Sequence, residues 1–125
     1  MSYINFNPNP LGKTVGDCVI RAISAFLGTS WEWAYSNLAA IGFEMCDMPS
    51  SNAVWGAFLD RCGCKRKVIP NTCPFCYTVD DFCKDHKTGS YLLSTDGHVV
   101  AVIEGDYYDA WDSGSEIPLY FWFKE

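Results

Sequence analysis

The chain has 125 residues, of which 49% are hydrophobic and 16% aromatic. This length suits a single domain over residues 1–125 with its own apolar core, and the composition excludes a disordered chain. A formal net charge of -6 argues against a surface that binds nucleic-acid phosphates. No apolar run is as long as a membrane span, and the first residues lack the pattern of a signal peptide. We therefore expect a cytoplasmic protein whose partners include neither nucleic acid nor a membrane.

An irregular segment opens the chain, because residues 1–16 are rich in Asn, Pro and Gly. Apolar residues at helical spacing then predict a helix over residues 18–27. Asp17 is placed to cap its start through a free backbone N–H, and Gly28 is placed to end it.

The remaining elements are predicted from capping boxes, apolar spacing and turn residues. They are a second helix from a capping box at Thr29–Glu32 to about Ile41 and Gly42, a third helix opened by Pro49–Asn52 and ended by Gly63, a strand over 65–69, a short helix over 79–86, and strands over 90–94, 98–104, 107–111 and 119–123. Helices come first and an antiparallel meander comes last. This order predicts an α+β domain with its N-terminal helices packed on a C-terminal antiparallel sheet.

Cys18 is the first candidate for chemistry, because it falls in the first turn of the first predicted helix. Unpaired backbone N–H groups and the positive end of the helix dipole favour a thiolate at that place. A cysteine there is a candidate nucleophile. The alternative is a small buried thiol that only packs.

His98 and Asp112 are expected to lie together at one edge of the sheet. His98 opens one predicted strand and Asp112 follows the end of the next, and in a hairpin the start of one strand lies beside the end of its successor. An imidazole held by a carboxylate is what a cysteine nucleophile needs, since the imidazole takes the thiol proton and the acid fixes the ring.

The segments Gly16–Cys18, Gly97–Val102 and Tyr108–Asp112 give the chain a resemblance to the papain-like cysteine peptidase superfamily. It is most similar to the compact bacterial and phage C39-like peptidases. The resemblance implies a minimal papain-like fold, a peptide or protein substrate, and hydrolysis of a peptide or isopeptide bond without a cofactor. It assigns Cys18 as nucleophile, His98 as general base and acid, and Asp112 as the orienting acid.

One feature of that superfamily is missing, since Gly12 stands where its members place an oxyanion-binding Gln. The candidate replacements are the side chains of Asn7, Asn9 and Lys13, beside the backbone N–H of Cys18. Losing one such donor typically costs about 10²–10³ in rate. A catalytically weak or inactive papain-like binding module is therefore the alternative to a peptidase.

Two close cysteine pairs form a second cluster, Cys62 with Cys64 and Cys73 with Cys76. Four such thiolates can hold a structural zinc, although the first pair has an unusual spacing. Reduced thiols are the favoured interpretation, and a redox disulfide between Cys73 and Cys76 is a third. A small zinc protein without catalytic chemistry is the corresponding functional alternative.

Overall fold

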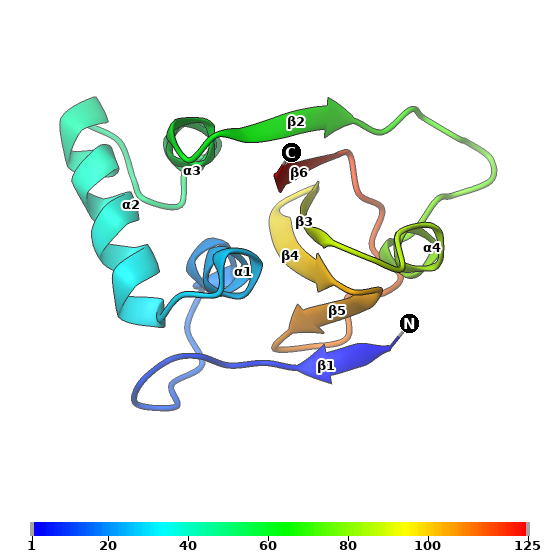
Figure 1. Cartoon of the computed structure of the whole chain (residues 1–125), viewed down its shortest axis with the longest axis horizontal. Coiled ribbons are helices and arrows are strands. Elements are labelled where there is room, and N and C mark those ends of the chain that lie inside the picture. Colours follow the sequence, from blue (N-terminus) through cyan, green and yellow to red (C-terminus); the bar gives the residue numbers. More distant parts are fainter. Residues whose placement is uncertain (1, 125) are drawn as a thin grey trace.

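The fold was examined in a computed structural model that describes residues 2–124, in which helices lie on both faces of one sheet (Figure 1). Among these residues the elements, in chain order, are β1 (Tyr3–Asn5), α1 (Cys18–Leu27), α2 (Trp31–Met45), α3 (Asn52–Arg61), β2 (Cys64–Val68), α4 (Val79–Asp85), β3 (Ser90–Thr95), β4 (His98–Ile103), β5 (Asp106–Asp109) and β6 (Tyr120–Lys124). The α+β class predicted from the sequence is confirmed. Among residues 2–124, no helix combines the length and the apolar character needed to cross a membrane.

The six strands form one sheet in the order β1-β5-β4-β3-β6-β2, with β1 and β2 at opposite edges (Figure 1). Strands β3, β4 and β5 form the expected antiparallel meander. The last strand does not continue it, because β6 pairs antiparallel with β3 on its other side and not with β5. Strand β2, for which the sequence predicted no partner, pairs antiparallel with β6. The short strand β1 pairs parallel to β5, with Ile4 opposite Tyr108, so the sheet is mixed and the expected all-antiparallel sheet is wrong. The Asn- and Pro-rich composition around β1 hides this strand, because its pairing comes from β5 and not from a pattern of its own.

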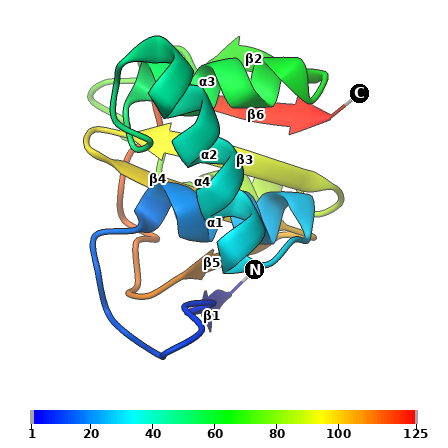
Figure 2. The same cartoon turned by 90° about the vertical axis from the view of Figure 1, so that its left-hand side faces the viewer.

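Two apolar cores lie on the two faces of the sheet. Alternate residues of β4 belong to different cores: Val99 and Ala101 face α1, α2 and α3, whereas Val100 and Val102 face α4. Figure 2 shows α1, α2 and α3 in front of the strands, and Figure 1 places α4 on the other side. The central strands are therefore buried on both faces, and α1 is fixed against β4, where the predicted site lies.

The first helix begins and ends where the sequence predicts. Gly28 has φ 68°, and its N–H binds the carbonyls of Ala25 and Ser24, as expected for a left-handed cap. Asp17 precedes the helix but makes no side-chain cap, so that expectation is wrong. Its carboxylate is used elsewhere.

The second helix differs from its prediction at both ends. Ser30, rather than Thr29, caps α2 by accepting from the N–H of Trp33 at 3.1 Å. The helix also continues through Gly42 to Met45. Gly42 is needed for packing rather than for stopping the helix, because a Cβ there would lie 2.8 Å from the carbonyl oxygen of Asp47.

Candidate active site

Cys18 is the first residue of α1, and its side chain is half-buried at the end of the helix that packs on β4. Val19 and Ile23 anchor this helix in the core that it shares with Val99 of β4. The thiol and the imidazole of His98 line the same cavity and lie close enough for each to shift the pKa of the other. The expected meeting of Cys18 with His98 is therefore present.

The thiol of Cys18 has a pKa below its usual value. Burial alone would raise the pKa, but hydrogen bonds from His98 and Val99 and the charges of His98 and Arg21 outweigh burial. The side chain is therefore biased toward the thiolate, which is the nucleophilic form of cysteine.

His98 opens β4 and is 9% exposed. Its Nε2 lies 2.6 Å from Oδ2 of Asp109, which leaves Nδ1 for the thiol of Cys18. Burial alone would lower the pKa of the imidazole, yet the bond to Asp109 and the contact with Cys18 raise it to about 9. The centroid of the Trp111 ring lies 4.8 Å from that of the imidazole, so the indole covers one side of His98.

The expected pairing of His98 with Asp112 is wrong, since Asp109 takes that place. Asp112 instead accepts from the hydroxyl of Tyr107 at 2.6 Å and from the N–H of Gly114, as a turn residue does. Burial and, after it, the hydrogen bond to Asp112 raise the pKa of Tyr107. Asp112 therefore anchors the loop after β5 and does not orient the imidazole.

The end of β5 explains this shift by three residues. The ladder between β4 and β5 runs from Ile103–Asp106 to Ala101–Tyr108, and β5 ends at Asp109. Asp112 lies beyond the strand, in a loop where strand register no longer places side chains. The sequence-based prediction continued this strand to residue 111 and therefore placed the acid three residues too late.

Asp109 is fully buried, and its carboxylate accepts four hydrogen bonds. Oδ1 accepts from Arg21 Nη2 at 2.9 Å and from the N–H of Ala110 at 2.8 Å. Oδ2 accepts from His98 and from the hydroxyl of Ser113, each at 2.6 Å. Burial alone would raise the pKa of Asp109, but its bonds to His98 and Ser113 hold it below the usual value. Asp109 is thus a fixed anion behind the imidazole.

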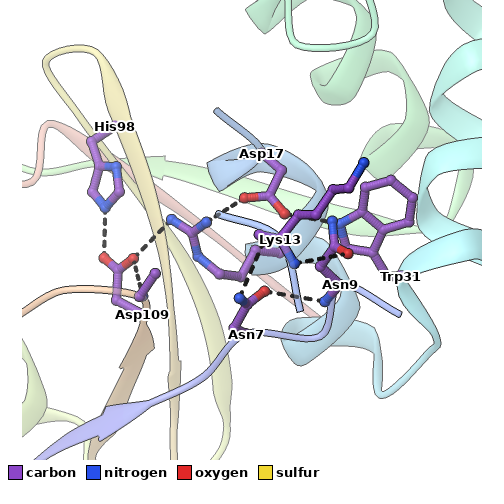
Figure 3. Close-up of polar contacts among 9 residues, drawn as sticks. Asn7, Asn9, Lys13, Asp17, Trp31, His98 and Asp109 are labelled. Carbon is purple, nitrogen blue, oxygen red and sulfur yellow. Dashed lines mark hydrogen bonds and ion pairs between the residues drawn. The ribbon is translucent and has the colours of Figure 1, made fainter. Parts of the chain in front are cut away.

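A chain of buried polar groups connects this acid to the residue before the nucleophile (Figure 3). Arg21 binds Asp109 with one nitrogen of its guanidinium and Oδ1 of Asp17 with the other. Oδ2 of Asp17 accepts from the indole N–H of Trp31 at 2.9 Å. Sequence reasoning did not use Arg21, although Asp17 and Arg21 have the i, i+4 spacing of a helix ion pair.

The expected oxyanion donors Asn7, Asn9 and Lys13 hold the N-terminal segment together instead. Asn7 donates from its side chain to the carbonyl oxygen of Lys13, and Asn9 accepts from the N–H groups of Leu11 and Lys13. Figure 3 shows these contacts running within that segment. None of the hydrogen bonds found for these side chains involves Cys18 or His98.

A cavity of about 270 Å³ opens directly beside the nucleophile. Small and polar residues line it together with the reactive pair: Cys18, Val19, Ser50, Asn52, Ser94, Thr95, Gly97, His98 and Val99. Its walls come from α1, from the loop before α3 and the first residue of that helix, and from the turn between β3 and β4. A substrate can therefore approach the sulfur of Cys18 from this side.

The four close cysteines do not form the considered zinc site. Cys62 and Cys64 lie where β2 begins, and Cys73 and Cys76 lie in the loop after β2 ends. Within residues 2–124, no group of three or more His, Cys, Asp or Glu side chains is arranged to hold a metal ion. All seven cysteines are free thiols, and no disulfide joins Cys73 to Cys76.

Comparison with known proteins gives no relative for this chain. No family model matches it, and neither the curated proteins nor the solved structures contain a match. The functional argument therefore depends on the residues of the site and their geometry.

Proposed function

We propose that the protein is a papain-like cysteine peptidase that hydrolyses a peptide or isopeptide bond with Cys18, His98 and Asp109. The observation that carries this proposal is the buried bond of 2.6 Å between His98 and Asp109, directly behind a half-buried thiol at a helix N-terminus. A nucleophile, a base and a group that orients the base are the elements of nucleophilic catalysis by cysteine.

In the proposed reaction, the thiolate of Cys18 attacks the carbonyl carbon of the scissile bond. The imidazolium of His98 gives its Nδ1 proton to the leaving amine, which departs and leaves a thioester on Cys18. Neutral His98 then takes a proton from water, and the resulting hydroxide attacks the thioester carbonyl. The acid product leaves, and Cys18 returns to the thiolate with His98 protonated.

The structure supports specific roles for the surrounding groups. Asp109 keeps the Nε2–H of His98 pointing at its carboxylate, so that Nδ1 faces the sulfur. The backbone N–H of Cys18 belongs to the first turn of α1, whose N–H groups have no partner within the helix, and it can bind the developing oxyanion. The cavity beside Cys18 can take a side chain that flanks the scissile bond.

The proposal is tested by digesting a mixture of unstructured peptides and reading the products by mass spectrometry. The wild-type protein and Cys83→Ala should cleave the same bonds, whereas Cys18→Ala should lose cleavage by about 10³-fold or more. Cys83 is a suitable control because it is fully buried in the other core. Cleavage by Cys18→Ala would contradict the mechanism. No cleavage by the wild type, with Cys18 still selectively alkylated, would favour the binding module.

A further inference from the structure

Arg21 is a buried cation that the proposed chemical steps do not use. Its side chain is 7% exposed, and it lies one helical turn after Cys18 on α1. Burying a guanidinium is costly unless carboxylates pair with it. Here the two carboxylates are Asp17, which precedes the nucleophile, and Asp109, which holds the imidazole.

Asp17 is itself held in place from a second helix. The indole N–H of Trp31 on α2 donates to Oδ2 of Asp17, and the Trp31 ring stacks on Tyr35 at 5.1 Å. Asp17 therefore gives up the usual capping bond and directs both oxygens to side chains. The result is a continuous series of contacts from Trp31 through Asp17 and Arg21 to Asp109.

We propose, resting on the peptidase function above, that Arg21 is a positioning residue: its guanidinium, bound to Asp17 through Nη1, fixes Oδ1 of Asp109 through Nη2, so that Oδ2 stays aimed at His98. Asp17 and Trp31 hold the guanidinium in the orientation that this contact needs. Two nitrogens of a rigid planar group are required, because Arg21 binds one carboxylate with Nη1 and the other with Nη2. A lysine keeps the charge but not this geometry.

The charged groups around the His98–Asp109 pair make a charge-conserving substitution the right probe. Cys18 and Arg21 face the pair from α1, and Asp17 lies just before that helix. The charge of Asp109 acts on Tyr3 of β1, and Asp112 lies in the loop after β5. Removing the charge of Arg21 would take the shared cation away from Asp17 and Asp109 and change the net charge of the whole cluster. Arg21→Lys changes the geometry and leaves the net charge as it is.

The experiment follows the ring protons of His98 by NMR across pH in the full-length protein, together with the pH profile of Cys18 alkylation by iodoacetamide. Arg21→Lys is compared with Arg61→Lys, whose arginine forms an exposed ion pair with Glu44. Trp31→Phe, which removes only the indole donor, is compared with Trp33→Phe on the same helix. His86 provides an internal reference in every sample.

We expect Arg21→Lys to lower the titration midpoint of His98 by about 1 pH unit, since a well-placed opposite charge is worth about 1–3 units. The pH above which Cys18 alkylation changes as His98 loses its proton should fall together with this midpoint. Trp31→Phe should shift both in the same direction by a smaller amount, and the two control variants should leave both unchanged. A purely structural role would lower the melting temperature without moving either midpoint.

Unchanged midpoints in a folded Arg21→Lys protein would overturn the proposal. If that variant does not fold, Trp31→Phe decides, and an unchanged His98 midpoint in it would overturn the proposal equally. Neither readout needs substrate cleavage. A protein that cleaves nothing but shows these shifts would fail the peptidase proposal and keep the positioning role.

Discussion

Cys18 and Cys83 are both withdrawn from water, on opposite faces of the same sheet, and they acquire opposite chemistry. Burial is the largest influence on each thiol, and it raises the pKa in both cases. Cys18 meets His98 and the backbone of Val99, which bring its pKa below the usual value. At Cys83, burial and the negative charge of Asp80 raise the pKa to about 11. The partners, and not the burial, decide which cysteine is a nucleophile.

Replacing His98 tests this comparison with the largest expected effect. At pH 6, iodoacetamide should label Cys18 well ahead of the other cysteines, because an ordinary thiol is then almost entirely protonated. His98→Ala should slow labelling of Cys18 by about 10²-fold, toward the rate of an ordinary thiol. The control is His86→Ala, since His86 stacks on Phe82 in the opposite layer. Equal slowing in both variants would contradict the assignment.

Replacing the two aspartates separates the acid found in the structure from the one expected from the sequence. Asp109→Asn should lower the titration midpoint of His98 from about 9 by more than 1 pH unit and slow Cys18 labelling near pH 8 by about tenfold. Asp112→Asn should leave both unchanged, because its bonds go to Tyr107 and Gly114. Histidine NMR and labelling kinetics check both. A shift in Asp112→Asn alone would restore the original expectation.

Cys18 and His98 could be found from the sequence because each depends on a local pattern. Helical spacing and Gly28 locate the helix that begins at Cys18, and the turn at Gly97 locates the strand that begins at His98. The His98–Asp109 pair depends on where β5 ends, and the predicted strand continued to residue 111 whereas β5 ends at Asp109. Strand ends alone indicated Asp112.

The remaining misses have a different physical cause. Asn7, Asn9 and Lys13 have the right chemistry for an oxyanion site, but their segment satisfies its own backbone groups with them. Arg21 is a buried charge on α1, and one of its two carboxylate partners, Asp109, comes from a strand far along the chain. Contacts between distant segments are what a pattern along one segment cannot show.

The pH dependence of stability gives a smaller effect, with a sign that follows from the pKa values. His98 has its pKa raised from 6.5 to about 9, so its contribution is complete below pH 6.5 and is lost as the pH rises through about 9. The lowered pKa of Cys18 contributes in the opposite sense, with stability that is present above 9 and lost as the pH falls. The two contributions therefore compensate each other in the wild type.

Cys18→Ser should expose the contribution of His98. Its free energy of unfolding should fall by about 1 kcal/mol between pH 6.5 and 9, whereas the wild-type value should change less. Urea titrations at a series of pH values measure both. A flat profile for Cys18→Ser would mean that Asp109 does not hold the imidazolium.

The distant cysteines should give the smallest effect. Replacing Cys73 and Cys76 together by Ser should leave Cys18 labelling unchanged, because they lie in the loop beyond the far end of β2. A chelator should likewise leave the melting temperature of the wild type unchanged. Melting that shifts with chelator, or a stoichiometric zinc content, would show a metal site that the structure does not form.

The most direct test of the central claim is the thiolate absorbance at 240 nm, measured as the difference between wild type and Cys18→Ser from pH 4 to 10. A cysteine paired with His98 and Asp109 should show an ionisation midpoint below that of an ordinary thiol at about 8.5. A difference signal that appears only above about pH 8 would show that Cys18 is an ordinary thiol and would contradict the account.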